Sequence, residues 1–257
     1  MMSHPTPYPD VNQVLHELVS GVHKALNTHC VGVYLYGSLA LGDFDPASSD
    51  IDFVVVTDDE LSAESVSALE ALHSRIAMNH PRWATELEGS YVPKADMGRY
   101  DPARAYHLHV YQGHVGMEQH GVHWVIERHL LREHGVVLSG PGTRSLIEPI
   151  SPDDLRRATT ALMGEWWAPK VDEPGRPYVT KYQRYVVLTM CRVLYTLHHG
   201  TVASKPVAAR WALAGLGERW AALIDRTLAG RAEGESKLVD ETCNFIRYTF
   251  EQCVPYQ

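Results

Sequence analysis

Hydrophobic residues in the first half of the chain follow two different periods. Two segments repeat apolar residues at the spacing of one helix face, residues 11–27 and 62–77. Ser62 stands where the second of these helices needs an N-cap. Four shorter segments are apolar or alternating and rich in β-branched and aromatic residues, which favours strands: 31–36, 51–57, 83–92 and 106–111. We therefore expect a small mixed sheet with helices.

The pattern changes after about residue 140. Residues 139–142, Ser-Gly-Pro-Gly, are typical of a linker, and no strand is predicted beyond them. Ser151-Pro152 is a helix-start signal. Helical spacing then covers residues 153–167, 181–199, 207–216, 220–228 and 235–252.

These patterns predict two domains. An α+β domain is expected over residues 1–140, with the mixed sheet described above. An all-α helical bundle is expected over residues 141–257. A single ligand site would then lie between the two domains, which is a common place for one.

Composition is that of an ordinary globular protein. The chain has 257 residues, of which 45% are hydrophobic and 21% charged. No apolar run approaches the roughly 18 residues that a membrane-spanning helix needs, and residues 1–10 do not resemble a secretory signal. The cysteines at positions 30, 191, 243 and 253 are far apart and form no CxxC pair. These features predict a cytoplasmic protein with reduced thiols.

The formal net charge of −8 argues against a nucleic-acid-binding protein, which usually presents a basic face. An acidic surface instead attracts cations, such as Mg²⁺ or a polycationic small molecule. Histidine occurs 15 times, often between His107 and His134. Because the spacing lacks the HExxH pair of zinc hydrolases, we expect most of these side chains at the surface or partly buried rather than in a metal site.

Two aspartates, Asp50 and Asp52, stand at the head of the second predicted strand. Side chains two residues apart in a strand point to the same face, which puts the Cβ atoms roughly 6–7 Å apart. Like charges at that distance repel each other unless cations are bound. Mg²⁺ prefers carboxylate and phosphate oxygens, and a pair of ions about 4 Å apart serves phosphoryl chemistry. Such a pair can also be a solvated turn, so it does not by itself assign a function.

Gly37 and Ser38 follow the preceding strand. Glycine allows a phosphate to approach the backbone, and a serine hydroxyl with neighbouring N–H groups can donate to phosphate oxygens. Phosphate donors beside metal ligands at one sheet edge suit phosphoryl or nucleotidyl transfer.

The order Gly37-Ser38, eleven residues, then Asp50-Ile51-Asp52 resembles the signature of the DNA polymerase β-like nucleotidyltransferase superfamily. The resemblance implies that Asp50 and Asp52 bind two catalytic Mg²⁺ ions and that Ser38 holds the triphosphate of a nucleotide.

The superfamily also implies a third carboxylate on a neighbouring strand, which takes the proton from the attacking hydroxyl. Glu86 and Glu88 both lie in the third predicted strand and share one of its faces. Leu87-Glu88 followed by a small residue resembles the relatives' third carboxylate, so Glu88 is the preferred base. Glu86 stays open as the alternative base and as a residue that contacts the acceptor.

Residues 131–141 and 185–195 resemble the domain junction and a following helix of streptomycin/spectinomycin adenylyltransferases, and the likeness spans about residues 30–215. It implies an N-terminal nucleotidyltransferase domain, with Arg192 and Lys205 in contact with the nucleotide phosphates. Basic side chains from the facing domain agree with the charge of a triphosphate, which two metal ions only partly balance.

One departure concerns the acceptor. The streptomycin/spectinomycin enzymes carry acidic residues just before that helix, facing the cationic groups of the drug. Here Tyr178 and Tyr182 occupy these positions. Tyrosine can stack on a sugar or hydrogen-bond a hydroxyl, but it supplies no negative charge. The two tyrosines are therefore candidates for acceptor binding, and their presence argues against streptomycin as the acceptor.

The sequence thus predicts Mg²⁺-dependent transfer of AMP from ATP to a hydroxyl of a small cationic molecule, such as an aminoglycoside or aminocyclitol, by a monomer or weak dimer. Three alternatives stay open: an antitoxin-type nucleotidyltransferase that modifies a protein or tRNA, a non-catalytic nucleotide-binding module, and a structural helical interaction protein with a degenerate first domain. The acidic charge argues against the first and the intact acidic pair against the second. The predicted catalytic residues are Asp50, Asp52 and Glu88, and those predicted to bind ATP are Gly37, Ser38, Arg192 and Lys205.

Overall fold

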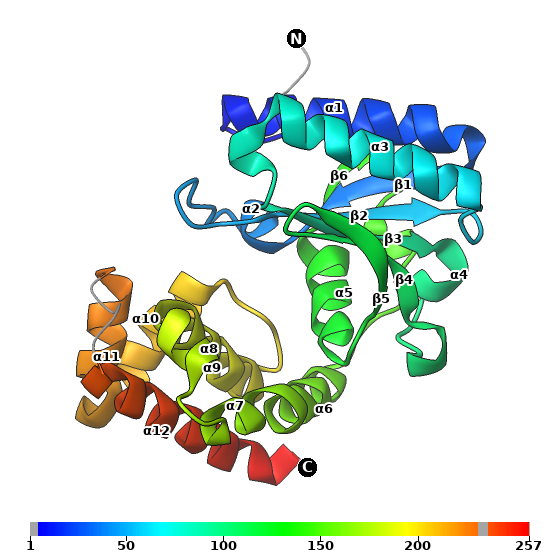
Figure 1. Ribbon diagram of the computed structural model, residues 1–257. Helices are drawn as coiled ribbons and strands as arrows, with labels where there is room; N and C mark the ends of the chain where they lie inside the picture. Colours follow the sequence, from blue (N-terminus) through cyan, green and yellow to red (C-terminus); the bar gives the residue numbers. More distant parts are fainter. Residues whose placement is uncertain (1–4, 231–235, 257) are drawn as a thin grey trace. The chain divides into compact units, whose positions relative to one another are not determined.

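Within residues 5–230 and 236–256, which this computed structural model describes, six strands form one mixed sheet in the order β5-β4-β3-β2-β1-β6 (Figure 1). The segments predicted at 31–36, 51–57 and 106–111 are confirmed as strands β1, β2 and β4. The strand bounds are β1 Cys30–Leu35, β2 Ile51–Thr57, β3 Leu87–Pro93, β4 Tyr106–Tyr111, β5 His114–Gln119 and β6 Val136–Ser139.

The third strand is shorter than the sequence predicts. Pro81–Trp83 form a 3₁₀ turn, and the backbone N–H of Glu86 donates to the carbonyl of Trp83, so that β3 begins only at Leu87. The apolar Trp83 at the head of the predicted strand packs against the ring of Phe44 instead. The alternating pattern therefore starts before the strand does.

Strands β5 and β6 were not predicted, and neither was helix α5 (His123–His134). Most of β5 is exposed at the edge of the sheet, so it shows no apolar alternation. Strand β6 has only 4 residues, which is too few for a periodic signal.

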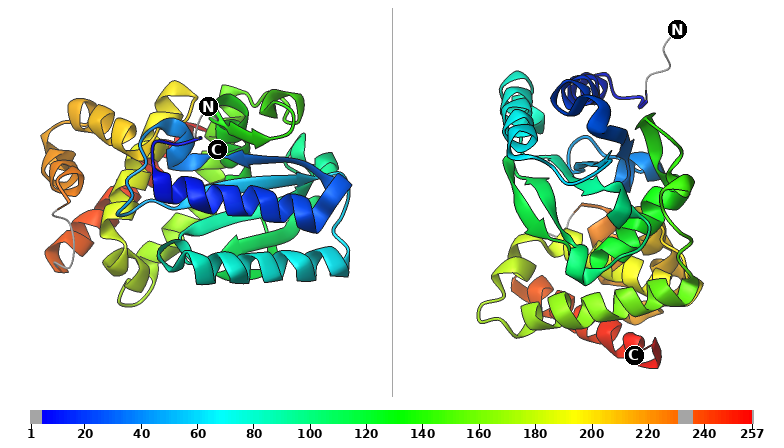
Figure 2. Two further views of the ribbon diagram at one scale, coloured as in Figure 1. Left: turned by 90° about the horizontal axis from the view of Figure 1, so that it is seen from above. Right: turned by 90° about the vertical axis from the view of Figure 1, so that its right-hand side faces the viewer.

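Helices cover both faces of the sheet. Helices α1 and α3 lie side by side on one face, and α5 lies on the other (Figures 1 and 2). The prediction of Ser62 as the N-cap of α3 is confirmed, because its hydroxyl accepts the N–H of Ser65. The helices of this half are α1 Pro9–Leu26, α2 Gly37–Leu41, α3 Ala63–Asn79, α4 Lys94–Met97 and α5.

The two-residue period of the strands separates the two faces chemically. Leu35, Phe53 and Tyr91 are buried against α1 and α3, in one apolar cluster with residues of both helices. Their strand neighbours Asp52 and Ser90 project from the opposite face. The predicted acidic pair therefore belongs to the face that carries α5.

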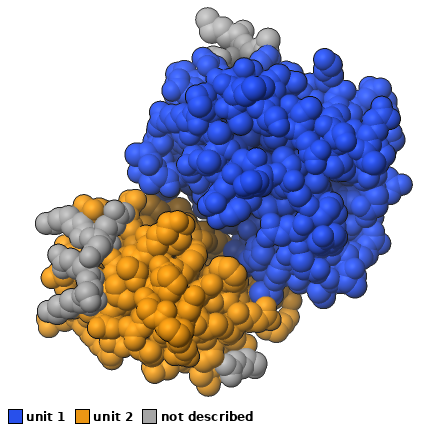
Figure 3. All heavy atoms as spheres, viewed as in Figure 1, with its two compact units in different colours: residues 1–149 blue, residues 150–257 orange. Residues whose placement is uncertain are grey.

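Two compact units divide the chain, residues 1–149 and 150–257 (Figure 3). The division follows Pro149 rather than residue 140, because the Arg132 guanidinium donates to the carbonyls of Arg144 and Ile147. These hydrogen bonds hold the residues that follow the expected linker against α5.

The described residues of the second unit form helices and no strand, as predicted. The prediction at 181–199 spans α8 and α9, which are separated at Tyr182, and the predicted start at Glu235 lies outside the described residues. The bounds are α6 Pro152–Leu162, a π-helical turn Met163–Trp167, α7 Ala168–Asp172, α8 Pro177–Lys181, α9 Gln183–His199, α10 Lys205–Gly215, α11 Glu218–Leu228 and α12 Ser236–Cys253.

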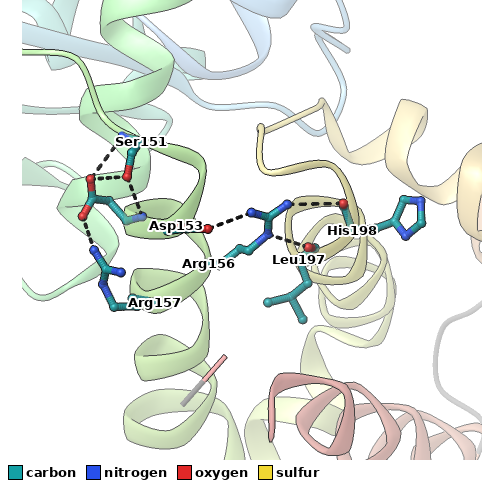
Figure 4. A network of polar contacts seen from close by, with 7 residues as sticks. Ser151, Asp153, Arg156, Arg157, Leu197 and His198 are labelled. Carbon is teal, nitrogen blue, oxygen red and sulfur yellow. Dashed lines mark hydrogen bonds and ion pairs between the residues drawn. The ribbon is translucent and has the colours of Figure 1, made fainter. Parts of the chain in front are cut away.

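Helix α9 is the centre of this unit: its residues 186–191 are buried in succession, so neighbours cover this part of the helix all round rather than along one face. Arg156 of α6 fastens its C-terminal end: Nε donates to the carbonyl of Leu197 at 2.9 Å, and Nη1 pairs with Asp153 at 2.9 Å (Figure 4). The Ser151 hydroxyl caps the start of α6. A cation at the last carbonyls of a helix satisfies acceptors that have no partner within the helix.

None of the described helices combines the length and the apolar character that crossing a bilayer requires. The cysteines are not joined in disulfides, and three of them, Cys191, Cys243 and Cys253, are buried.

Candidate active site

The turn after β1 lies directly against the start of β2. Gly37 has φ of 64°, and a Cβ atom at this position would collide with the carboxylate of Asp52. Only glycine meets both conditions without strain. The backbone N–H of Tyr36 donates to the carbonyl of Asp52 at 3.1 Å, which ties the turn to the strand.

Ser38 is the second residue of the short helix α2, which begins at Gly37. Its carbonyl accepts the N–H of Asp43 at 3.1 Å, just beyond the C-terminal end of the helix. Its Oγ atom is buried and has no hydrogen-bond partner among the described residues. A buried hydroxyl without a partner is costly, so this atom is suited to a hydrogen bond with a ligand.

The acidic side chains come from two neighbouring strands. Asp50 is exposed in the loop just before β2, and Asp52 is half-buried as the second residue of that strand. Strands β2 and β3 pair in parallel, and the register places Glu88 opposite Asp52. The side chains of opposed residues project from the same face of the sheet, so the strands bring Asp52 and Glu88 together.

The pKa of the Tyr36 phenol reflects the negative charge around Asp52 and Glu88. Its phenol is buried, which raises its pKa well above the ordinary value, and the carboxylates of Glu127, Asp52 and Glu88 raise the pKa further. The Tyr36 hydroxyl lies 3.4 Å from Oε2 of Glu127 on α5. Three carboxylates therefore act on one phenol, which marks a concentration of negative charge.

Glu86 lies in the turn before β3. Its carbonyl accepts the N–H of Ile51 at 2.7 Å, and its carboxylate accepts the hydroxyl of Thr85 at 2.9 Å. Glu88, in contrast, lies inside the strand beside Asp52. The geometry thus favours Glu88 over Glu86 as the group nearest the acidic centre.

The donors present fit Mg²⁺. Across the described part of the chain, no three His, Cys, Asp or Glu side chains form a ready metal cage. Asp50 and Asp52 are carboxylates, which Mg²⁺ prefers, and the ion commonly takes one or two protein carboxylates and completes its shell with water and phosphate oxygens. A nearby orphaned hydroxyl, that of Ser38, agrees with a phosphate in this position.

The remaining predicted residues belong to the second unit. Arg192 is a half-buried residue of α9, and Lys205 is the first residue of α10, with Nζ 4.0 Å from the ring centre of Tyr185. The rings of Tyr178 and Tyr182 lie 4.8 Å apart, so the structure brings these two predicted residues together.

The N-terminal part of the chain matches the nucleotidyltransferase domain family over residues 21–93. Residues 145–252 match the C-terminal domain of aminoglycoside adenylyltransferases. The two matches support the family that the sequence resembles, the aminoglycoside adenylyltransferases. The protein is accordingly an enzyme, a nucleotidyltransferase, and the predicted fold class is confirmed.

Relatives in this family match nearly the whole chain. An aminoglycoside (3'') (9) adenylyltransferase of Shigella flexneri is 27% identical over 252 residues, covering 93% of each chain. A spectinomycin 9-adenylyltransferase of Campylobacter jejuni is 24% identical, covering 82% of each. The structure of a spectinomycin adenyltransferase from Enterococcus faecialis with ATP and spectinomycin superposes with a TM-score of 0.74 at 16% identity, over 94% of this chain and 98% of that one. This last likeness concerns the fold.

Several residues of the site were missed by sequence reasoning. The carboxylates of Glu127 and Asp52 act on the phenol of Tyr36 at the acidic centre. Ser90 forms hydrogen bonds with His109 and His120. Ser90 is two residues after Glu88 in β3, so the two side chains project from the same face. This spacing is the signal in the sequence that could have identified Ser90. Most histidines between residues 107 and 134 are exposed or partly buried, as predicted, whereas His107, His120 and His129 are buried.

A cavity of about 280 Å³ lies elsewhere in the first unit, with Asp96, His107 and Trp124 in its lining. None of the predicted site residues lines it. The site is therefore defined by its side chains and not by this cavity.

Proposed function

We propose that the protein transfers AMP from ATP to a hydroxyl of an aminocyclitol or aminoglycoside, with two Mg²⁺ ions. The observation that carries this proposal is the parallel register of β2 and β3, which places Glu88 opposite Asp52 beside the Gly37-Ser38 turn. A base and a phosphate-binding turn beside metal-binding carboxylates are the parts that nucleotidyl transfer needs. The family of the chain supports the same reaction.

In this reaction Glu88 accepts the proton of the acceptor hydroxyl. The resulting oxygen forms a bond to the α-phosphorus while the bond from that phosphorus to the bridging oxygen breaks, and pyrophosphate leaves. The Ser38 hydroxyl donates to the triphosphate, and Arg192 and Lys205 offset its negative charge. Mg²⁺ held by Asp50 and Asp52 would supply further charge neutralisation.

The acceptor is proposed to be an aminocyclitol rather than streptomycin. Tyr178 and Tyr182 stand where the streptomycin/spectinomycin enzymes carry acids, and Lys170 and Lys181 lie over these rings, with Nζ 5.3 Å and 4.7 Å from the respective ring centres. Cations beside tyrosines repel a polycationic guest but permit stacking and hydrogen bonding with a ring that carries hydroxyls.

A pyrophosphate-release screen tests the proposal. The purified protein is incubated with ATP, Mg²⁺ and a panel of aminocyclitols and aminoglycosides, and EDTA serves as the control. We expect release with an aminocyclitol, little or none with streptomycin, and none with EDTA.

Two of the alternatives give different results in the same design with labelled ATP. Label transferred to a protein or tRNA fraction, with no small-molecule acceptor, would support the antitoxin-type enzyme. Bound ATP without pyrophosphate for any acceptor would support a nucleotide-binding module. Either result overturns the proposed acceptor.

A further inference from the structure

A histidine stands between two carboxylates next to the proposed base. His109 on β4 places Nε2 4.0 Å from Oε1 of Glu88 and 3.7 Å from Oε2 of Glu118 on β5. The imidazole is only 14% exposed, whereas the Glu118 side chain is 60% exposed. The ring therefore lies inside the protein with one nitrogen directed at the acidic side.

The other nitrogen of the ring is held by a buried hydrogen-bond chain. Oγ of Ser90 lies 2.8 Å from Nδ1 of His109 and 3.0 Å from Nε2 of His120. Burial lowers the pKa of His109, and it lowers the pKa of His120 to about 3, assisted by the neighbouring histidines His107, His109 and His123. Both imidazoles are therefore neutral near pH 7, and each carries a single N–H.

The single proton of the Ser90 hydroxyl leaves two possible directions for this chain. In one, His120 donates to Ser90, Ser90 donates to Nδ1 of His109, and the His109 proton is on Nε2. In the other, Nε2 of His109 is bare and turns its lone pair toward two carboxylates, while Nδ1–H of His120 is a buried donor. Nδ1 of His120 has no hydrogen-bond partner among the described residues.

Electrostatics selects the first direction. A lone pair facing the carboxylates of Glu88 and Glu118 is repelled by them, whereas an N–H is attracted. A buried donor without a partner is also rarer in proteins than an acceptor without one. The chain from His120 through Ser90 therefore fixes His109 with its Nε2–H toward Glu88.

We propose that His109 is a positioning residue for nucleotidyl transfer, whose Nε2–H orients the carboxylate of Glu88 toward the acceptor hydroxyl. This inference rests on the proposed function, in which Glu88 is the base. Catalytic hydrogen bonds are often long before substrate binds and shorten in the complex, and a small rotation of Glu88 closes the distance to Nε2. Ser90 and His120 keep the ring in the required tautomer, as outer-sphere partners do for histidine ligands.

A matched pair of substitutions tests the donor. His109→Gln keeps an N–H near the position of Nε2, and His109→Met has a similar length but no donor. We expect His109→Met to lower kcat by about 10-fold or more with an unchanged KM for ATP, and His109→Gln to recover most of the rate. Ser90→Ala frees the tautomer and should lower kcat in the same direction by less.

The control is a buried histidine on the opposite face of the sheet. His73 is 5% exposed and lies 2.7 Å from the Tyr91 hydroxyl. His73→Met should lower the melting temperature without changing kcat. Equal losses of kcat in His109→Met and His109→Gln, or an unchanged kcat in both, would refute the positioning role.

A double-mutant cycle separates this inference from the proposed function. If His109 acts through Glu88, then His109→Met causes little further loss in a Glu88→Gln background. A full additional 10-fold loss of kcat in that background would show that His109 does not act through Glu88. It would refute this inference and leave the proposed function standing. A wild-type protein that releases no pyrophosphate with any acceptor, or a fully active Glu88→Gln, would instead overturn the proposed function.

Discussion

The two faces of the sheet in the first unit use the same strands for opposite purposes. On the face beneath α1 and α3, Leu35 and Phe53 are fully buried in a continuous apolar cluster. On the other face, Asp52 of β2 and Glu88 and Ser90 of β3 project away from that cluster. One face contributes stability through apolar burial, and the other gathers charge at a cost in stability.

The contrast shows why such a site needs the apolar face behind it. Carboxylates held close together repel each other, and a buried hydroxyl without a partner adds a further cost. Strands that are anchored on one face can hold those groups in fixed positions on the other. Substitutions on the polar face should therefore change turnover, and those on the apolar face should change stability.

The largest effect is expected for the acidic pair. Asp50→Asn and Asp52→Asn each remove a metal-binding charge, and turnover should fall by about 10³-fold or more while the melting temperature stays the same or rises. Pyrophosphate release with saturating ATP and Mg²⁺, together with thermal unfolding, measures both. Near-wild-type turnover in either variant would refute the assignment of Asp50 and Asp52 as Mg²⁺ ligands.

The proposed base comes next. Glu88→Gln should lower kcat by about 10²- to 10³-fold and leave ATP binding intact, because the amide cannot accept the proton. Glu86→Gln is the matched control two residues away, and its kcat should stay close to that of the wild type. ATP binding by calorimetry and steady-state rates distinguish the two variants, and a reversed pattern would make Glu86 the base.

On the apolar face, Leu72→Ala tests the opposite expectation. The Leu72 side chain fills the space that a Cβ of Gly21 would need, at the packing contact between α3 and α1. Truncation should lower the free energy of unfolding by about 3 kcal/mol with unchanged kcat at a temperature where the variant is folded. Urea unfolding measures the free energy of unfolding. A large loss of kcat would contradict the expectation that substitutions on this face change stability and not turnover.

The smallest effect concerns pH. Burial lowers the pKa of His73 to about 4, so below its unfolded value of about 6.5 the unfolded chain binds a proton that the folded chain excludes. This stability is fully present above pH 6.5 and is lost as pH falls toward 4. Between pH 7 and pH 5 the wild type should lose about 2 kcal/mol more than His73→Gln, as urea unfolding at the two values would show.

Much of the fold could be predicted because its central elements carry clear periods. Strands β1, β2 and β4 and the main helices have apolar patterns that their burial imposes. The edge strand β5 is solvated, and α5 mixes histidines with charged residues, so neither has a strong pattern. Those two elements take their conformation from tertiary pairing, which a local pattern does not contain.

The site was predictable only in part for a similar reason. Gly37, Ser38, Asp50 and Asp52 are close in sequence, so their spacing is itself the signal. The choice of Glu88 over Glu86 depends on where β3 begins, and this follows from the 3₁₀ turn at Pro81–Trp83. The contact of His109 with Glu88 depends on the register in which β4 pairs with β3. The sequence does not predict that register.

The parallel pairing of β2 and β3 also has a consequence for how activity arises during folding. Helix α3 must return the chain along the sheet before β3 can insert between β2 and β4. A growing chain that ends before β3 already carries both aspartates but lacks the glutamate opposite them. When the denatured protein is diluted from denaturant, turnover should therefore recover only as fast as β3 pairs with β2. This pairing joins distant parts of the chain and is slow compared with helix formation.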